Sequence, residues 1–524
     1  MQIQGKQFIQ GQRSQQGQDE LYSVDATTGE TLATFYAATE QEANAACVAA
    51  AEAFQVFRQT TIEQRAQLLN TIADELDALD DGFIHKVMQE TALPEGRIRG
   101  ERARTSGQMR LFASVLARGD FLGARIDSAL PDRTPLPRPD LRQAKLGVGP
   151  VAVFGASNFP LAFSTAGGDT ASALAAGCSI VMKAHTGHMI TAEYVAGAIT
   201  AALEKCGLPG GVFNMLYGSN IGGVVVRHPE IQAVGFTGSL RGGRAICDMA
   251  AARPQPIPVF AEMSSINPML LLPEALQNRG TEIARQLTDS VVAGCGQFCT
   301  NPGMIIGIRS PQFTEFLQQM SQNIANSPAQ TMLNRGVLAS YQHGLQELSQ
   351  HSGVTHLAGQ PQQGTQAFPQ LFRAEAELLL NGDPLLQEEV FGPVSVVIEV
   401  ESHQQLKAAL RAVRGQLTIT LLAEDNDLVN FADLVPIIEQ KAGRLLVNGY
   451  PTGVEVCDAM IHGGPYPATS DSRGTSVGTL AIERYLRPVC YQNYPQHLLP
   501  AALQDSNPLN IDRLVNGKMT REAL

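Results

Sequence analysis

The chain has 524 residues, of which 44% are hydrophobic and 17% are charged. A chain of this length can bury large cores and exceeds one typical domain, so we expect two large domains and a smaller additional element. The formal net charge is −12, and the lysines and arginines are scattered along the chain. This charge pattern argues against nucleic acid as a partner.

Neither the N-terminus nor any apolar run suggests export or membrane insertion. Residues 1–8 lack the charged start and apolar stretch of a secretory signal, and no apolar run approaches the length of a membrane span. We therefore expect a cytoplasmic protein without a membrane span. The eight cysteines form no CxxC pair, so we expect them to be reduced.

The beginning of the chain is predicted to be helical and then extended. Residues 40–128 alternate alanine-rich and charged stretches at helical spacing. The segment 129–146 contains four prolines, which exclude a helix and suit an extended edge or arm.

From residue 147 the pattern changes to short apolar runs that alternate with alanine-rich helices. Such a pattern predicts a parallel, doubly wound α/β sheet that binds ligands at the carboxyl ends of its strands. The expected strands are 151–154, 179–183, 212–215, 233–236 and 257–260, and the expected helices lie near 163–176, 189–205, 219–227 and 239–252.

A second α/β series begins at residue 267. It continues through a helix at about 276–294 and a strand at 304–308, and it extends to about residue 470. Strand-like sequence returns near 486–494. We therefore expect a second α/β domain followed by a short additional strand.

Cys299 is the most informative candidate for chemistry. It lies between Gly296 and the turn 301–303, which predicts a loop where backbone amides can face an oxyanion. The alternative is a buried, inert cysteine, as most cysteines are. Cys295 lies one helical turn earlier, but no clustered histidine or cysteine accompanies the pair, so we predict no metal site.

Two further side chains can cooperate with a thiol. Glu262 follows the apolar run 259–261, where apolar surroundings can raise the pKa of its carboxyl group and make it a general base. Its alternative is an ordinary charge at a strand end. Asn158 offers an amide donor. A thiol, a carboxylate and an amide are the groups needed to attack a carbonyl carbon, hold its oxyanion and activate water.

Three segments suggest a nucleotide cofactor, although each signal is weak alone. The turn 238–243 follows a strand and opens a helix, so its amides can approach a pyrophosphate, but its glycine spacing differs from GxGxxG. Lys183 ends a strand and can reach a nucleotide, whereas a lone lysine is more often solvated. The segment 388–393 joins two acids, an aromatic ring and a tight turn.

Together these motifs resemble, in order and spacing, those of the aldehyde dehydrogenase superfamily over essentially the whole chain. Features at 261–268, 296–303 and 505–509 resemble the NADP-type branch that includes 2,5-dioxovalerate (α-ketoglutaric semialdehyde) dehydrogenases, with bacterial fatty-aldehyde dehydrogenases as near relatives. The shared motifs are Ser-Asn-Phe-Pro (157–160), Val-Met-Lys (181–183), Gly-Phe-Thr-Gly-Ser (235–239), Glu262, Gly-Gln-Phe-Cys-Thr (296–300), Glu-Glu-Val-Phe-Gly-Pro-Val (388–394) and Asn-Gly-Tyr-Pro-Thr-Gly-Val (448–454).

The resemblance implies NAD(P)-dependent oxidation of an aldehyde to a carboxylic acid. Cys299 would attack the aldehyde, and the Asn158 side chain and the Cys299 amide would hold the oxyanion of the thiohemiacetal. Hydride transfer would leave a thioester, which water activated by Glu262 would hydrolyse. A non-redox cysteine hydrolase or acyltransferase is the competing class, and a non-catalytic nucleotide-binding protein is a third.

The resemblance also implies where the cofactor binds and which cofactor is used. Thr186 stands where NAD-preferring relatives carry a glutamate that would repel a 2′-phosphate. We therefore expect NADP to be accepted and NAD use to be possible, although Ile221 stands where several NADP-using relatives present an arginine. The expected cofactor residues are Lys183, Thr186, Gly238, Ser239, Gly243, Glu389 and Phe391.

The expected substrate is 2,5-dioxopentanoate (α-ketoglutaric semialdehyde), oxidised to 2-oxoglutarate, on branch resemblance alone. A medium- or long-chain fatty aldehyde is the alternative. Arg104 and Arg110 could recognise a substrate carboxylate or could be salt-bridged surface arginines. Ser264 and Ser265 depart from a pair of glycines usual in the superfamily. The aromatic candidates for the tunnel wall are Phe159, Phe163, Phe298 and Tyr450, which would also suit an alkyl chain.

The resemblance further implies a small oligomerisation element. A paired strand in this element would complete a sheet across subunits, so we expect a homodimer or a dimer of dimers. The expected division is a Rossmann-like cofactor-binding domain (1–128 and 147–262), a catalytic domain (263–470), an oligomerisation element (129–146 and 471–500) and a C-terminal tail (501–524).

Overall fold

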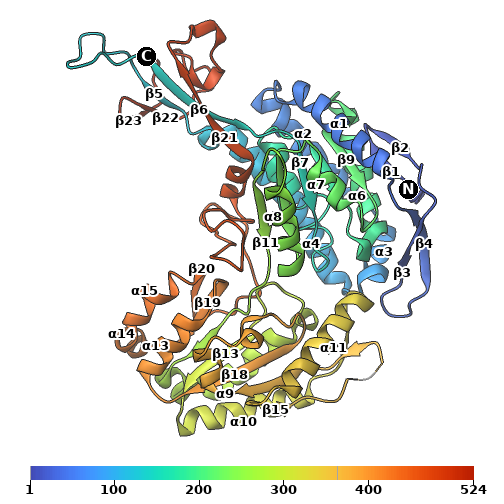
Figure 1. Cartoon of the computed structure of the whole chain (residues 1–524), viewed down its shortest axis with the longest axis vertical. Coiled ribbons are helices and arrows are strands. Elements are labelled where there is room, and N and C mark those ends of the chain that lie inside the picture. Colours follow the sequence, from blue (N-terminus) through green and yellow to red (C-terminus); the bar gives the residue numbers. More distant parts are fainter. Residues whose placement is uncertain (1, 363) are drawn as a thin grey trace.

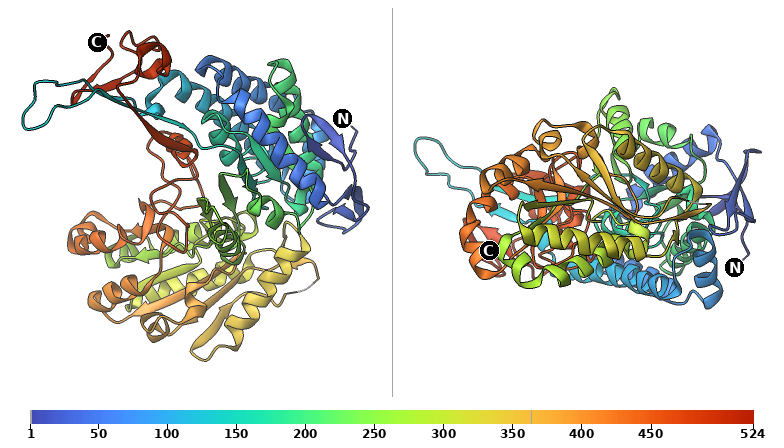
Figure 2. Two further views of the ribbon diagram at one scale, coloured as in Figure 1. Left: turned by 45° about the horizontal axis from the view of Figure 1, so that its top comes forward. Right: turned by 90° about the horizontal axis from the view of Figure 1, so that it is seen from below.

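The computed structural model describes residues 2–362 and 364–524 and consists of two lobes and a projecting arm (Figure 1). Each lobe contains a largely parallel sheet with helices packed around it, so the fold is α/β, as predicted. The arm leaves the first lobe on the side away from its N-terminus (Figure 2). Within the described residues, no helix has the length and apolar character to span a membrane.

The first lobe is built on a seven-stranded sheet with the order β11-β10-β7-β8-β9-β1-β2. Its parallel strands are mostly apolar runs, so they lie within two residues of their predicted positions. They are β7 (Val151–Phe154), β8 (Ile180–Lys183), β9 (Phe213–Leu216), β10 (Ala233–Thr237) and β11 (Val259–Glu262), with β1 (Gln7–Ile9) and β2 (Gln12–Ser14) added antiparallel.

The strand order creates a switch point between β7 and β10. The chain passes from β7 to β8 and β9 on one side and then returns to β10 and β11 on the other. Ligands bind outside the carboxyl ends of the strands at such a point. Asn158 follows β7 and Gly238 follows β10, so both loops open onto one crevice.

Helices cover both faces of this sheet, and a short hairpin, β3 (Glu20–Val24) and β4 (Thr31–Tyr36), lies beside them. The Thr39 side chain caps the first helix by accepting from the Glu42 amide, and the Glu42 side chain accepts from the Thr39 amide in return. The helices are α1 (Glu40–Phe57), α2 (Ile62–Asp77), α3 (Asp81–Thr91), α4 (Glu95–Arg118), α5 (Gly168–Ala175), α6 (Met189–Lys205), α7 (Gly222–Arg227) and α8 (Leu240–Ala251).

The second lobe repeats the α/β arrangement with the strand order β15-β17-β18-β13-β12-β19-β20. Its strands are β12 (Met269–Leu271), β13 (Met304–Ile308), β15 (Val354–Ala358), β17 (Gln370–Ala374), β18 (Val394–Val400), β19 (Gln416–Leu422) and β20 (Ala442–Val447), and β14 (Gln330–Thr331) pairs with β16 (Gln366–Ala367) outside this sheet. Its helices are α9 (Pro273–Val292), α10 (Pro311–Asn326), α11 (Arg335–Gln350), α12 (Ala376–Leu380), α13 (His403–Ala412), α14 (Asp425–Asn430) and α15 (Val435–Ile438).

The arm is a five-stranded sheet with the order β21-β6-β5-β22-β23. Its strands are β5 (Arg125–Asp127), β6 (Leu141–Gly147), β21 (Leu486–Gln492), β22 (Arg513–Val515) and β23 (Lys518–Thr520). The proline-rich segment contains no helix, as predicted, but residues 131–137 turn back between the bridged residues Leu130 and Arg138. Only the following β6 is extended, and it pairs with β21 over seven residues. Two domain boundaries differ from the expected division. Strand β5 belongs to the arm although residues 1–128 were expected in the first domain, and β22 and β23 belong to the arm although residues 501–524 were expected to be a separate tail.

Candidate active site

A cavity of about 690 Å³ lies between the two lobes at the switch point of the first sheet. A volume of this size suits a cofactor or a small ligand. The residues that line it are Ala156, Ser157, Asn158, His185, Thr237, Gly238, Ser239, Leu240, Arg241, Glu262, Met263, Ser264, Cys299, Asn334, Gly336, Val337, Ser340, Glu388, Glu389 and Phe391.

Cys299 lies on a loop whose backbone is tightly turned. Helix α9 ends at Val292, and the following short 3-10 turn has positive φ at Cys295 (59°) and Gly296 (63°). A Cβ at Gly296 would lie 2.3 Å from the Gly392 carbonyl carbon, so only glycine fits there. Asn267 fixes the loop because its side-chain amide donates to the Cys299 carbonyl oxygen at 2.9 Å.

The thiol, an imidazole and a carboxylate meet at this loop. Cys299 Sγ lies 3.4 Å from His462 Nε2, and the same nitrogen lies 3.0 Å from Glu262 Oε1. Because one nitrogen faces both groups, it can accept from the thiol or donate to the carboxylate, but it cannot do both at once. The Ser476 hydroxyl donates to the other Glu262 oxygen, and its oxygen lies 3.1 Å from the His462 carbonyl oxygen, the second acceptor within reach of the same proton.

The surroundings set different protonation states for these groups. Burial raises the pKa of the Cys299 thiol well above its ordinary value, and the carboxylates of Glu262 and Glu389 raise it further. Burial opposes ionisation of Glu262 as well, but the His462 charge and the hydrogen bonds from His462 and Ser476 hold the pKa of Glu262 below its ordinary value. A thiol beside a carboxylate therefore needs a group that removes its proton.

Asn158 lines the same cavity as Cys299. Its side-chain amide donates to the Gln297 carbonyl at 2.9 Å, two residues before the thiol. Arg97 donates to the Asn158 carbonyl oxygen at 3.1 Å and so fixes the backbone of this loop. The arrangement provides an amide donor for an oxyanion formed on an atom bound to Cys299.

The opposite end of the cavity is formed by the first turn of α8. Ser239 caps this helix by accepting from the Gly242 amide at 3.2 Å, so the free amides of the first turn face the cavity together with Arg241. Lys183 and Thr186 do not line the cavity. Gly243 does not line it either, and its cofactor role stays a prediction. A Cβ there would lie 2.5 Å from the Met263 sulfur, so this glycine permits close packing of α8 on the segment after β11.

His185 lines the cavity between the predicted residues Lys183 and Thr186. Burial lowers the pKa of Lys183 and lowers that of His185 well below its ordinary value. Thr186 begins a 3-10 turn directly after His185. Of these three residues only His185 lines the cavity, and Lys183 and Thr186 lie beside it in the chain. Ile221, by contrast, is buried in an apolar cluster.

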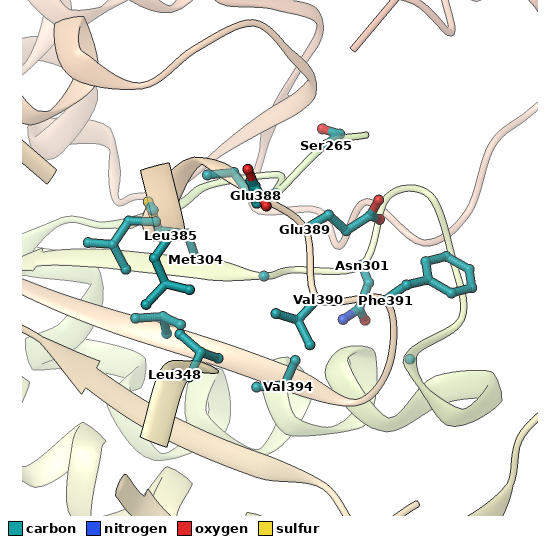
Figure 3. Close-up of a pocket in the computed structure, with 15 residues that line it drawn as sticks. Ser265, Asn301, Met304, Leu348, Leu385, Glu388, Glu389, Val390, Phe391 and Val394 are labelled. Carbon is teal, nitrogen blue, oxygen red and sulfur yellow. The ribbon is translucent and has the colours of Figure 1, made fainter. Parts of the chain in front are cut away.

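Glu389 and Phe391 reach the cavity from a loop of the second lobe. Figure 3 shows Val390 on the side of Leu348 and Val394, whereas Glu389 and Phe391 point away from them. Burial raises the pKa of Glu389 to about 8, and a hydrogen bond with the Ser264 side chain partly offsets this. The unusual serine at 264 therefore contacts the cavity.

An aromatic and cationic cluster lies beside Cys299. The Phe159 ring centroid is 5.1 Å from that of Phe163 and 5.8 Å from that of Phe298. The guanidinium carbon of Arg104 lies 5.5 Å from the Phe163 centroid, and Arg104 Nε and Nη2 are shielded from solvent and have no hydrogen-bond partner among the described residues. Its charge also opposes the rise in the thiol pKa of Cys299.

Comparison with known proteins decides the family of this chain. The model of the aldehyde dehydrogenase family matches residues 12–486. The chain belongs to the aldehyde dehydrogenase family. It is therefore an NAD(P)-dependent aldehyde oxidoreductase that takes an aldehyde as its substrate.

Two curated aldehyde dehydrogenases are similar to this one over their full lengths. The alpha-ketoglutaric semialdehyde dehydrogenase of Acinetobacter baylyi is 55% identical over 520 residues, which cover 99% of each chain. The alpha-ketoglutaric semialdehyde dehydrogenase 2 of Azospirillum brasilense is 50% identical over 524 residues, covering 99% of this chain and 100% of the relative.

Solved structures of aldehyde dehydrogenases share the fold. The NADP-dependent glyceraldehyde-3-phosphate dehydrogenase of Bacillus halodurans, complexed with NADP, aligns with a TM-score of 0.79 at 20% identity over 94% of this chain and 99% of that chain. The betaine aldehyde dehydrogenase of Staphylococcus aureus, in complex with NAD+, aligns with a TM-score of 0.78 at 21% identity, covering 94% and 96%.

Tyr450, predicted at the substrate site of this aldehyde dehydrogenase, lies elsewhere, and Arg110 fits the alternative given for it, a salt-bridged surface arginine. Arg110 is on the surface and forms salt bridges with Asp74 and Asp77 at 2.7 and 2.8 Å. Tyr450 packs against α9, where its hydroxyl donates to Gln286 at 3.1 Å. Both depend on neighbours that the local sequence does not reveal.

Sequence reasoning missed His462 and Ser476, which surround Glu262 in the fold. Neither lies in a motif that marks it, and His462 is 163 residues from Cys299 along the chain. Only the return of residues 462–476 past β11 brings them to the site. The sequence shows no clustered partners for Cys299, and we predicted no metal site on that ground. In the fold, however, Glu262, Cys299 and His462 lie close together.

Proposed function

We propose that this aldehyde dehydrogenase oxidises 2,5-dioxopentanoate (α-ketoglutaric semialdehyde) to 2-oxoglutarate and accepts NADP. The observation that carries this proposal is the shielded Arg104 guanidinium beside Cys299, because two of its donors lack a partner. A carboxylate on the substrate would satisfy them. The names of the two full-length relatives support the same substrate.

The first chemical step is attack of Cys299 Sγ on the aldehyde carbon. The thiol proton passes to His462 Nε2, 3.4 Å away, which can hold it beside Glu262. The resulting oxyanion accepts hydrogen bonds from the Asn158 side chain and the Cys299 amide. The bound nicotinamide supplies the acceptor for the hydride that leaves the thiohemiacetal carbon.

The second step is hydrolysis of the thioester that remains on Cys299. Glu262 is ionised because its pKa is held low, and its carboxylate can remove a proton from a water in the cavity. The water oxygen attacks the thioester carbon, and the leaving sulfur is Cys299. The product is a carboxylate.

The rest of the substrate would lie along the aromatic and cationic cluster. Burial lowers the pKa of Arg104, and the Glu101 charge partly offsets this. Within the described residues no hydrogen bond or salt bridge joins the two side chains, because the Glu101 carboxylate accepts from the Leu161 and Ala162 amides and pairs with Arg97 at 3.4 Å. Arg104 is therefore available for a distal carboxylate. A fatty aldehyde would instead leave this guanidinium buried and unpartnered, which is costly.

NADP acceptance rests on the charge at the adenosine end of the cavity. His185 lines the cavity there, Lys183 ends the neighbouring strand β8, and Thr186 carries no charge that would repel a 2′-phosphate. At the opposite end, Glu389 and Phe391 would position the nicotinamide ribose and ring. The first turn of α8, from Ser239, would hold the pyrophosphate.

The proposed oligomer is a homodimer or a dimer of dimers. Strand β21 is the first strand of the arm sheet, so its outer edge is available for pairing with another copy. Light scattering coupled to size-exclusion chromatography tests this proposal. A monomer at micromolar concentration would contradict it.

An aldehyde panel tests the substrate. Initial rates are measured by cofactor reduction with 2,5-dioxopentanoate, its neutral analogue pentanal, and decanal, each with NADP and with NAD. We expect the highest kcat/KM for 2,5-dioxopentanoate. A higher value for decanal would favour the fatty aldehyde alternative, and ester hydrolysis without aldehyde-dependent cofactor reduction would favour a non-redox hydrolase.

A further inference from the structure

The side chains of Cys299, His462 and Glu262 also form a set of metal ligands. One ligand atom from each, Sγ, Nε2 and a carboxylate oxygen, lies within 4.8 Å of the other two. Thiolate, imidazole and carboxylate are the three ligand types that proteins use for zinc. We propose that this cluster binds one Zn²⁺ ion reversibly and that binding switches the enzyme off.

The distances between the ligand atoms fit a tetrahedral ion without large movements. Zinc bonds of about 2.0 to 2.3 Å at tetrahedral angles separate neighbouring ligand atoms by roughly 3.3 to 3.6 Å. The Cys299 Sγ to His462 Nε2 distance is 3.4 Å, and the Nε2 to Glu262 Oε1 distance is 3.0 Å. An ion would therefore replace the direct contacts between these three groups.

The site is accessible and supported from outside the ligand set. Cys299 and Glu262 line the cavity between the lobes, which gives an entry path and leaves a fourth position for water. The Ser476 hydroxyl donates to the second Glu262 oxygen, so it orients one of the three ligands, whereas His462 Nδ1 is buried without a partner among the described residues. Such outer partners are typical of protein metal sites.

Binding would change the charges at the site in a defined way. The Cys299 Sγ–H bond breaks, its proton passes to solvent, and an Sγ–zinc bond forms in its place. No oxidation or reduction takes place. The nucleophile and the base of the aldehyde reaction are then both held by the ion, so the enzyme cannot form or hydrolyse a thioester until a chelator removes the metal.

The decisive experiment is a titration of the full-length chain with ZnCl₂ against a chromogenic chelator, without aldehyde or cofactor. We expect one zinc ion per chain. His462→Gln and Cys299→Ser should weaken binding by at least about 100-fold, and Ser476→Ala by about 10- to 100-fold. His343→Gln, which changes an exposed histidine outside the site, and Cys490→Ser, which changes an exposed cysteine, should bind as the wild type does.

Cobalt provides a spectroscopic readout of the same site. Co²⁺ bound to the wild type should give a thiolate-to-cobalt charge-transfer band, which Cys299→Ser should lose and Cys490→Ser should keep. A band that persists in Cys299→Ser, or zinc affinity that is unchanged in His462→Gln, would overturn the proposal.

A measurement on the wild type alone covers the case in which a variant does not fold. Zinc should slow iodoacetamide alkylation of Cys299, identified by peptide mapping, and a chelator should restore the rate. Alkylation at an unchanged rate in saturating zinc would also refute the site. None of these measurements uses an aldehyde, so their failure is distinct from failure of the proposed substrate.

Discussion

Arg104→Met is the substitution that most directly tests how this enzyme selects its substrate. Methionine keeps much of the length and apolar contact of arginine, so it can still pack on Phe163. It removes the two shielded donors, Nε and Nη2, that lack a partner in the free protein. The substitution should therefore lower the rate only for a substrate whose carboxylate accepts hydrogen bonds from these two donors.

The expected magnitude follows from the number of donors. A hydrogen bond to a charged group contributes about 1.5 to 3 kcal/mol, so two of them give roughly 3 to 6 kcal/mol. In the variant, water can solvate the substrate carboxylate and recover part of this free energy. We therefore expect a loss at the lower end of the range, about 3 to 4 kcal/mol. At 1.36 kcal/mol for each factor of ten, kcat/KM for 2,5-dioxopentanoate should fall about 100- to 1000-fold.

The assay compares substrates on one enzyme, which cancels differences in active-site concentration. The rate with pentanal, which has no carboxylate, should stay within a few fold of the wild type. The melting temperature should rise slightly, because the variant no longer buries unpartnered donors. Arg110→Met is the matched control, since Arg110 pairs with Asp74 and Asp77 on the surface, and it should leave both rates unchanged. Equal losses for the two aldehydes in Arg104→Met would refute the reasoning.

Four further outcomes are expected. Cys299→Ala should bind NADP and form no thioester in mass spectra, whereas Cys295→Ala should keep turnover. Glu262→Gln should accumulate the thioester, visible as a burst of reduced cofactor followed by a slow phase, and steady rapid turnover would contradict its role as base. Thr186→Glu should raise KM for NADP about tenfold or more while sparing NAD, because two like charges repel. Burial raises the pKa of Glu389 to about 8, above the pKa of about 4.3 that glutamate has in the unfolded chain. Between these two pH values the folded state binds more protons than the unfolded state, so the protein loses stability as pH rises. Glu389→Gln should therefore gain in melting temperature over the wild type between pH 5 and pH 8 in scanning calorimetry, and a constant difference would contradict the raised pKa.

The central sheet and several site residues could be predicted from the sequence because their signals are local. Strands β7 to β11 are mostly apolar runs, Asn158 follows β7, and Glu262 is the last residue of β11. Parallel strands bring their carboxyl ends to one edge of the sheet. An error of one or two residues in the predicted strand ends therefore does not change the prediction that these residues lie close together. Resemblance to a family then supplied their order and roles.

The remaining features depend on contacts between distant segments. His462 reaches Cys299 only through tertiary packing, and nothing in its neighbours marks it. Strands β22 and β23 have three residues each, too few to show an alternating pattern. Gly243 lies in a glycine-rich turn that suggests phosphate binding, and its close packing against the Met263 side chain could not be predicted from the sequence.

The segment that carries His462 and Ser476 has a consequence for synthesis of the protein. Residues 468–470 lie along β11, where Glu262 and Thr469 form a β-bridge. Domains fold from the N-terminus as the ribosome releases them, so Cys299 and Glu262 emerge long before the partners that complete their site. A nascent chain therefore carries an unshielded thiol and a carboxylate without its imidazole until the last tenth of translation. The enzyme gains its reactivity as one of the final events of its own assembly.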